Sequence, residues 1–148
     1  MLPAFREDGW LPEGHYGATW DAIIEFFGGQ VGSPRALVLA NLLSWRDAAR
    51  LAGLSGRLLI NGSFVSTKLN PGDFDLIFIY DTATKERIDG DVVSRQLTSY
   101  DFCKSHFSGD IFVFWEENIN RFPAFCDTSM FDRVKDTGIP KGVLEVSL

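Results

Sequence analysis

The chain has few cysteines, no excess of positive charge and no long apolar run, and each lack excludes a class of protein. Its 148 residues include 2 cysteines, too few for the disulfide framework of a small secreted domain. The formal net charge of −6 argues against nonspecific binding of long nucleic acid, which depends on Lys and Arg. No run approaches the roughly 18 apolar residues of a membrane span. We therefore expect neither a membrane nor nonspecific nucleic acid as a partner.

The first ten residues also lack the apolar core of a secretory signal, because Arg6, Glu7 and Asp8 interrupt them. Together with the low thiol content, this favours a cytoplasmic protein. Hydrophobic residues make up 45% of the chain, with 13 Phe and 4 Trp, which is typical of a well-packed globular protein. The length predicts a single domain over residues 1–148.

Capping signals predict two helices in the first third of the chain. Thr19 is a suitable N-cap for a short helix that the Gly-Gly pair at 28–29 ends. Ser33 and Pro34 are typical of the N-cap and first position of a longer helix that runs to Ala52. Apolar residues at three- and four-residue spacing give this helix one buried face: Val38, Leu42, Trp45 and Ala49.

Short apolar runs predict strands at 58–60, 76–80, 111–115 and 141–146. The polar segment 81–90 is expected to be a loop, and 91–106 an amphipathic helix. This order predicts an α/β (α+β) fold in which helices flank a mixed sheet. Four residues of the segment 118–140 either join the core or form an exposed patch for a partner: Phe122, Phe125, Met130 and Phe131.

The segment 58–80 contains the pattern that carries chemistry. Gly62 and Ser63 follow one predicted strand, and Asp73 and Asp75 lie at the start of the next. A glycine permits a sharp turn and the close approach of a phosphate, and a helical turn that begins at Ser63 would present free N–H groups. Residues two apart on a strand project to one face, so the two carboxylates repel each other unless a divalent cation or a raised pKa relieves them. Such oxygen ligands suit Mg²⁺ or Mn²⁺.

The Gly-Ser pair, the nine intervening residues and the Asp-Phe-Asp-Leu strand start resemble the nucleotidyltransferase superfamily of DNA polymerase beta. The chain also resembles a small bacterial nucleotidyltransferase-like family in three further segments: Leu-Pro-Glu-Gly at 11–14, Thr-Trp-Asp at 19–21 and Lys-Gly-Val-Leu-Glu-Val at 141–146. The resemblance implies transfer of a nucleoside monophosphate from a nucleoside triphosphate (NTP), such as ATP, to an acceptor hydroxyl, with Mg²⁺ or Mn²⁺ at Asp73 and Asp75. It further implies that Gly62 and Ser63 hold the β- and γ-phosphates.

The superfamily also requires a third carboxylate from a neighbouring strand. Asp110 is the best candidate, because it directly precedes the apolar run 111–115. Glu116 and Glu117 lie at the far end of that run, roughly 20 Å away. Lys68 lies between the turn and the carboxylates, where a cation can meet the triphosphate; the alternative is a solvated loop lysine.

A second hypothesis explains the same residues without catalysis. A fold can be retained when its activity is lost, and the chain shows no evident second domain or base-reading element to select an acceptor. In this reading the protein is a degenerate nucleotidyltransferase-fold module that acts through a partner protein encoded nearby. The antitoxin-like or regulatory component of a bacterial two-gene system is one such role.

Overall fold

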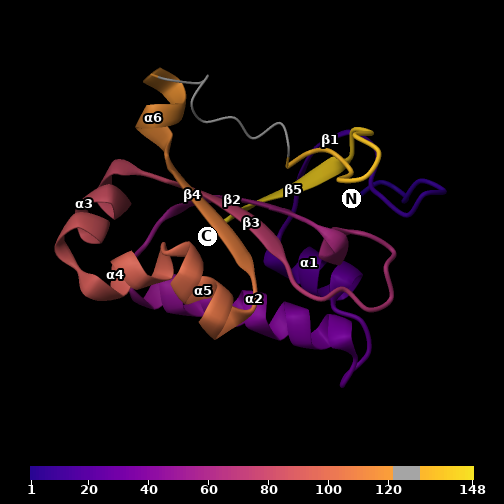
Figure 1. Cartoon of the computed structure of the whole chain (residues 1–148), viewed down its shortest axis with the longest axis horizontal. Helices are drawn as coiled ribbons and strands as arrows, with labels where there is room; N and C mark the ends of the chain where they lie inside the picture. Colours follow the sequence, from indigo (N-terminus) through magenta and orange to yellow (C-terminus); the bar gives the residue numbers. More distant parts are fainter. Residues whose placement is uncertain (122–130) are drawn as a thin grey trace.

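The computed structural model describes residues 1–121 and 131–148, which form a five-stranded sheet with helices packed against it (Figure 1). The strands are β1 (Gly14–Gly17), β2 (Gly56–Asn61), β3 (Asp75–Tyr80), β4 (Asp110–Trp115) and β5 (Gly142–Ser147). The described helices are α1 (Trp20–Phe27), α2 (Pro34–Leu51), the single 3-10 turn η1 (Ser63–Val65), α3 (Thr82–Gly90), α4 (Val92–Leu97), α5 (Tyr100–Phe107) and α6 (Glu116–Arg121). The predicted fold class is confirmed.

The strands follow the order β1-β5-β2-β3-β4 across the sheet. β2 is antiparallel to both β3 and β5, whereas β3 is parallel to β4 and β1 is parallel to β5. Because β3 and β4 run in the same direction, their first residues, Asp75 and Asp110, lie opposite each other. The last residue of β2, Asn61, lies opposite Asp75 on the other side. The ends of three strands therefore meet at one edge of the sheet.

Helices α1, α2, α4 and α5 lie together on one side of the sheet, which we call the helix face (Figure 1). Alternate strand residues point into it, and the core there includes Leu58, Leu76 and Phe78. Trp45 of α2 packs edge-on against Phe78, with ring centroids 5.6 Å apart. Its indole N–H donates to the carbonyl oxygen of Leu97 at 3.0 Å, so the largest buried ring is also satisfied as a donor.

The opposite side of the sheet, which we call the second face, has a smaller apolar cluster: Leu59, Ile77, Ile79 and Val143. Ile119 of α6 packs on part of this cluster, and so does Phe131. Because side chains alternate along a strand, Asp75 lies on the same face as Ile77, and Asp110 on the same face as Phe112. The candidate acids therefore project away from the helix layer.

The two predicted N-terminal helices are confirmed with their caps. Thr19 accepts a hydrogen bond from the N–H of Ala22 at 3.2 Å, and α1 ends at Gly28. Ser33 caps α2, and Pro34 is its first residue. The predicted apolar face of α2 is buried at all four positions: Val38, Leu42, Trp45 and Ala49.

Three predictions about secondary structure were wrong or incomplete. The segment 81–90 is not a loop, since α3 occupies it; Asp81 caps this helix, which buries only Thr84 and so has no apolar stripe to read. The segment 91–106 forms two helices, because Ser99 caps α5 after α4 has ended. The predicted strands also omit β1, whose pairing partner β5 lies at the other end of the chain. A four-residue strand paired so far away leaves no local signal.

Of the four residues of the segment 118–140 that could join the core, the structure describes one. Phe131 is half-buried and packs against the second face, as the core reading predicted. Phe122, Phe125 and Met130 lie outside the described residues. None of the described helices is both long and apolar enough to cross a membrane.

Candidate functional site

The acids predicted from sequence meet at the shared edge of β3 and β4. Asp75 and Asp110 are the first residues of these strands and are paired in register. Asp73 precedes the strand by two residues, so it lies in the adjoining loop rather than on the strand as expected. Its charge nevertheless acts on Asp75. The structure therefore brings all three predicted carboxylates together.

Lys104 of α5 reaches this edge and pairs with two of the acids. Its Nζ lies 3.0 Å from Asp73 Oδ2 and 2.7 Å from Asp110 Oδ1. The hydroxyl of Tyr100, one helical turn earlier, donates to the same oxygen of Asp110 at 3.0 Å. These contacts raise the pKa of Lys104, chiefly through the hydrogen bonds to Asp110 and Asp73. Burial works to raise the pKa of Asp110, but the hydrogen bonds from Lys104 and Tyr100 lower it overall.

Asp75 has the opposite electrostatics. Burial, followed by the charges of Asp73 and Asp110 and a hydrogen bond with Asp110, raises its pKa to about 6. The charge of Lys141 opposes this shift only in part. Asp75 is thus the acid of the cluster whose charge is least well compensated.

The Gly-Ser turn lies directly against Asp75. Gly62 has φ +78°, and a Cβ built on it would lie 2.2 Å from Asp75 Oδ2. A glycine is required here because any side chain would collide with the carboxylate and strain the backbone. Ser63 begins η1, and its carbonyl oxygen accepts a hydrogen bond from Ser66 Oγ at 2.6 Å.

Arg35, in the first turn of α2, holds the loop that follows this turn. Its guanidinium donates to the carbonyl oxygens of Phe64 at 2.6 Å and of Ser66 at 3.0 Å, and also to that of Lys68. The side chain of Lys68 is exposed, and Lys68 is not among the residues that line the cavity described next. Among the described residues, the side chain of Lys68 makes no ion pair, so its predicted role in phosphate binding stays a prediction.

A cavity of about 550 Å³ lies over the acids on the second face. Asp75, Asp110 and Gly62 form its acidic end. Its strand-side wall is apolar and includes Ile77, Phe112 and Phe114. Its outer wall comes from the segment 131–141 and carries three cations: Arg133, Lys135 and Lys141. The cavity thus has negative charge at one end, positive charge on its outer wall and an apolar surface between them. This arrangement suits a polar ligand that also has an apolar part.

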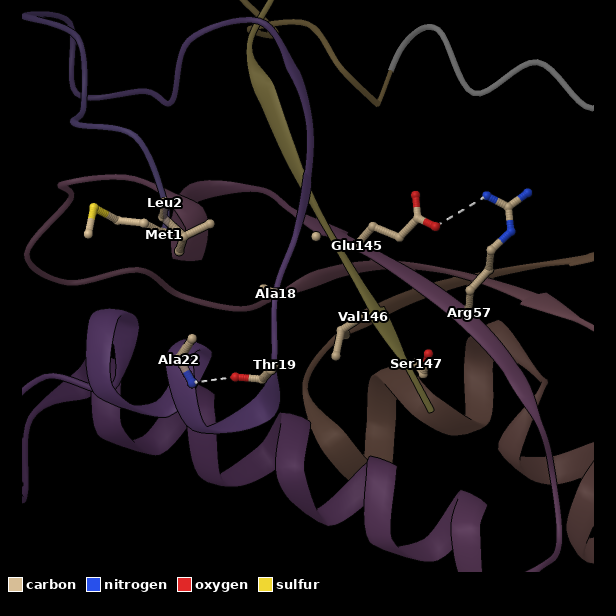
Figure 2. Close-up of a pocket in the computed structure, with 10 residues that line it drawn as sticks. Met1, Leu2, Ala18, Thr19, Ala22, Arg57, Glu145, Val146 and Ser147 are labelled. Atoms are coloured by element: carbon tan, nitrogen blue, oxygen red, sulfur yellow. Dashed lines mark hydrogen bonds and ion pairs between the residues drawn. The ribbon is translucent and has the colours of Figure 1, made fainter.

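Another cavity, of about 480 Å³, lies between the N-terminus, the start of α1 and the end of β5 (Figure 2). Figure 2 shows Glu145 of β5 reaching Arg57 of β2, an ion pair with atoms 3.7 Å apart. Thr19, also in its wall, is engaged in capping α1. None of the predicted site residues lines this cavity among those the structure describes. We therefore place the candidate site in the cavity over Asp75.

The comparisons with known proteins give a family and no activity. A family model described as a family of unknown function, DUF6932, matches residues 3–147. The chain belongs to this family. Neither a curated protein nor a solved structure was found to match the chain. The chemistry of this DUF6932 site therefore has to be argued from its own residues.

The three carboxylates are chemically suitable ligands for a divalent metal ion, but their present positions do not form a metal-binding group. Carboxylate oxygens are preferred ligands of Mg²⁺ and Mn²⁺. The raised pKa of Asp75 comes first from burial and then from the charges of Asp73 and Asp110, and a cation would relieve that repulsion. Within residues 1–121 and 131–148, however, no three Asp, Glu, His or Cys side chains are grouped to hold a metal ion. The positive charge between Asp73 and Asp110 comes instead from Lys104. A metal ion bound here would replace that ammonium group.

Sequence reasoning missed the basic residues of the site. Tyr100 and Lys104 are four residues apart on a helix, which places both on one face just before Asp110. That spacing was a usable signal. Lys141 had no such signal, because its place beside the site depends on the pairing of β5 with distant strands.

Proposed function

We propose that the chain is a nucleotidyltransferase-like protein that binds an NTP and transfers its nucleoside monophosphate to an acceptor hydroxyl. The observation that carries the proposal is the register of Asp75 and Asp110 at a strand edge, with Asp73 beside them and Gly62 against Asp75. The order of strand, Gly-Ser turn, acidic antiparallel strand and third acid on a parallel strand agrees with the motif-level resemblance.

In this reaction the acceptor oxygen forms a bond to the α-phosphorus while the bond from that phosphorus to the bridging oxygen breaks, and pyrophosphate leaves. Asp73 and Asp75 would hold Mg²⁺ or Mn²⁺, with Asp110 on the acceptor side, where it can also take the acceptor's proton. The bound cation supplies positive charge that stabilises the charge developing on the transferred phosphoryl group. Gly62 lines the acidic end of the cavity. In this proposal Gly62 and the adjoining Ser63 would hold the β- and γ-phosphates. A cytoplasmic location, where NTP is plentiful, agrees with this proposal.

The test is metal binding and transfer in the same preparation. Calorimetry with Mn²⁺ should detect binding by the parent chain and none by the double variant Asp73→Asn, Asp75→Asn. Labelled NTPs with candidate RNA, protein and small-molecule acceptors should then show transfer by the parent only. Equal Mn²⁺ affinity in parent and double variant would end the metal assignment.

The second candidate function is a non-catalytic module that acts through a partner protein, such as the antitoxin-like or regulatory component of a bacterial two-gene system. The observation that favours it is Lys104, whose ammonium group already compensates Asp73 and Asp110. Thermal unfolding with and without Mg²⁺ and each NTP separates the two functions. A ligand present at 100 times its dissociation constant adds about 2.7 kcal/mol to stability. No shift with any nucleotide would favour the partner-binding module.

The variant Lys104→Met also distinguishes the two candidate functions. If the carboxylates are metal ligands, removal of the competing ammonium group should tighten Mn²⁺ binding. If the ion pairs only hold α5 to the sheet edge, the variant should gain no Mn²⁺ affinity and should unfold at a lower temperature.

A further inference from the structure

Lys141 is a largely buried lysine at the candidate site, and the charges of Asp75 and Asp132 act on it. Its side chain is 7% exposed, and its Nζ lies 4.1 Å from the centroid of the Trp10 ring. Among the residues that the structure describes, this ammonium group donates no hydrogen bond and lies within no ion pair. Burial lowers the pKa of Lys141, and the charges of Asp75 and Asp132 oppose that shift only in part. Contact with an aromatic face also offsets part of the cost of burying the charge. A ligand that brings negative charge to Nζ would explain the arrangement.

The position of Lys141 is fixed by backbone contacts on both sides. Its N–H donates to the carbonyl oxygen of Asp132 at 2.7 Å, and the next N–H, of Gly142, donates to Leu11 at 3.0 Å. Trp10, whose ring covers the ammonium group, bridges to Ser66 in the loop after the Gly-Ser turn. Lys141 is therefore held between Asp132 and the adjacent residues Trp10 and Leu11, and Trp10 in turn pairs with the loop after the predicted phosphate-binding turn.

Lys141 shares its cavity with Gly62 and Asp75, and Arg133 and Lys135 lie on the same outer wall. Arg133 is oriented by a hydrogen bond to the carbonyl oxygen of Gly138 at 3.1 Å. Three cations converge on a cavity whose acidic end is the proposed metal site. A polyphosphate is the ligand class that matches both, because its oxygens pair with ammonium and guanidinium groups and with a divalent cation.

We propose that Lys141 is the phosphate-binding cation of this cavity and that the cavity takes a polyphosphate chain. The inference rests on the proposed function only for the identity of that chain as the triphosphate of an NTP. It assigns to Lys141 the role that sequence reasoning gave to Lys68. Arg133 and Lys135 add exposed positive charge at the cavity mouth.

The experiment uses inorganic tripolyphosphate as the probe, with and without Mg²⁺, in calorimetric titrations of the full chain. The parent should bind it, Lys141→Met should weaken binding at least tenfold, and Lys141→Arg should retain most of the affinity. Lys85→Met is the matched control, because Lys85 is on α3, outside the cavity, and pairs with Asp89. It should bind like the parent. Lys68→Met tests the rival lysine and should also bind like the parent.

A structural role for Lys141 predicts a different pattern. Methionine keeps the apolar length of the side chain and removes the cost of burying the charge, but it also loses the attraction between Lys141 and Asp75. These two effects oppose each other, so urea stability without ligand should change little. Lower stability in Lys141→Met with unchanged tripolyphosphate affinity would overturn the inference. Lys141→Gln serves as a second neutral variant if the methionine variant does not fold. Loss of affinity in Lys68→Met instead, or no binding by the parent, would also overturn it.

The outcomes for Lys141 and for nucleotidyl transfer are separable. Tripolyphosphate binding that depends on Lys141, without transfer from any NTP to any acceptor, would support the inference and contradict the proposed function. If the parent transfers nucleotide and Lys141→Met does so at the same rate and with the same KM for the NTP, the proposed function is supported and the inference about Lys141 is contradicted.

Discussion

Strand β3 begins at Asp75 and is followed at its other end by Asp81, and the two carboxyl groups lie in opposite surroundings. Asp81 accepts hydrogen bonds from the N–H of Thr84 at 2.9 Å and from the hydroxyl of Ser55. Burial works to raise its pKa, but these hydrogen bonds lower it overall. At Asp75, burial and the neighbouring acids Asp73 and Asp110 raise the pKa to about 6.

The difference separates Asp81, whose carboxylate stabilises the fold, from Asp75, whose carboxylate is poorly compensated by the folded chain. Donors of its own chain satisfy Asp81, so its charge contributes to the stability of α3. Asp75 is held among other acids, so its charge opposes folding. Perturbed carboxyl groups of the second kind gather at functional sites. The comparison predicts that variants at the first end of β3 change ligand chemistry, whereas variants at the other end change stability.

The largest expected effect is that of Asp110→Ala on transfer. In the proposed mechanism Asp110 acts on the acceptor side, so its loss should keep much of the NTP affinity. Transfer should fall by 100-fold or more, roughly 2.7 kcal/mol of barrier. Labelled-NTP transfer and a nucleotide titration of the same variant measure the two effects separately. Equal transfer rates in parent and variant would remove Asp110 as the third ligand.

How much of this site was predictable depends on how local each signal is. Asp110 could be predicted from sequence because it directly precedes the apolar run 111–115, so its place at the start of a strand depends only on neighbouring residues. Lys104 reaches Asp73 across 31 positions, and that contact exists only once α5 has packed against the edge of the sheet. Lys141 depends likewise on the pairing of β5, which no neighbouring residue reveals.

The same rule applies to the fold. Thr19, Ser33 and Pro34 mark helix starts through their own chemistry, so α1 and α2 were predictable. Helix α3 has an equally good cap in Asp81, but a segment that buries one threonine gives no periodic pattern. Polarity was mistaken there for loop structure.

Gly62→Ala should give the next largest effect. Its φ of +78° and ψ of −172° belong to a region that essentially only glycine adopts, so the change should cost about 2 kcal/mol of stability. The added Cβ would also lie 2.2 Å from Asp75 Oδ2 and displace that carboxylate. Urea unfolding and Mn²⁺ calorimetry should therefore both change. Gly72→Ala is the control, because a Cβ there has no atom within 4 Å. Unchanged Mn²⁺ affinity in Gly62→Ala would show that Asp75 does not need its present position.

The pH dependence of stability without metal tests Asp75 directly. The pKa of its carboxyl group is about 6 in the folded chain but returns to the ordinary value of 3.8 when the chain unfolds. Between these values the folded state binds more protons, so stability should fall as pH rises through this window. A shift of this size represents about 3 kcal/mol unscreened, and solvent screening should reduce it to about 1.5 kcal/mol. Asp75→Asn should abolish this decline, as urea unfolding from pH 4 to 7 would show. An identical decline in the variant would assign it to another group.

Asp81→Ala should have the smallest effect and the opposite sign. Loss of the hydrogen bond to the N–H of Thr84 removes the N-cap of α3, which should cost about 1 kcal/mol of stability at neutral pH. Because the folded pKa of Asp81 is lowered, this contribution is present above the unfolded pKa and lost on acidification. The deficit of the variant should therefore shrink toward low pH, where Asp75→Asn also loses its advantage. Asp89→Ala, which breaks an exposed pair with Lys85, is the control and should leave stability unchanged. Mn²⁺ and nucleotide titrations of Asp81→Ala should match the parent; a weakened ligand affinity would mean that the two ends of β3 are coupled.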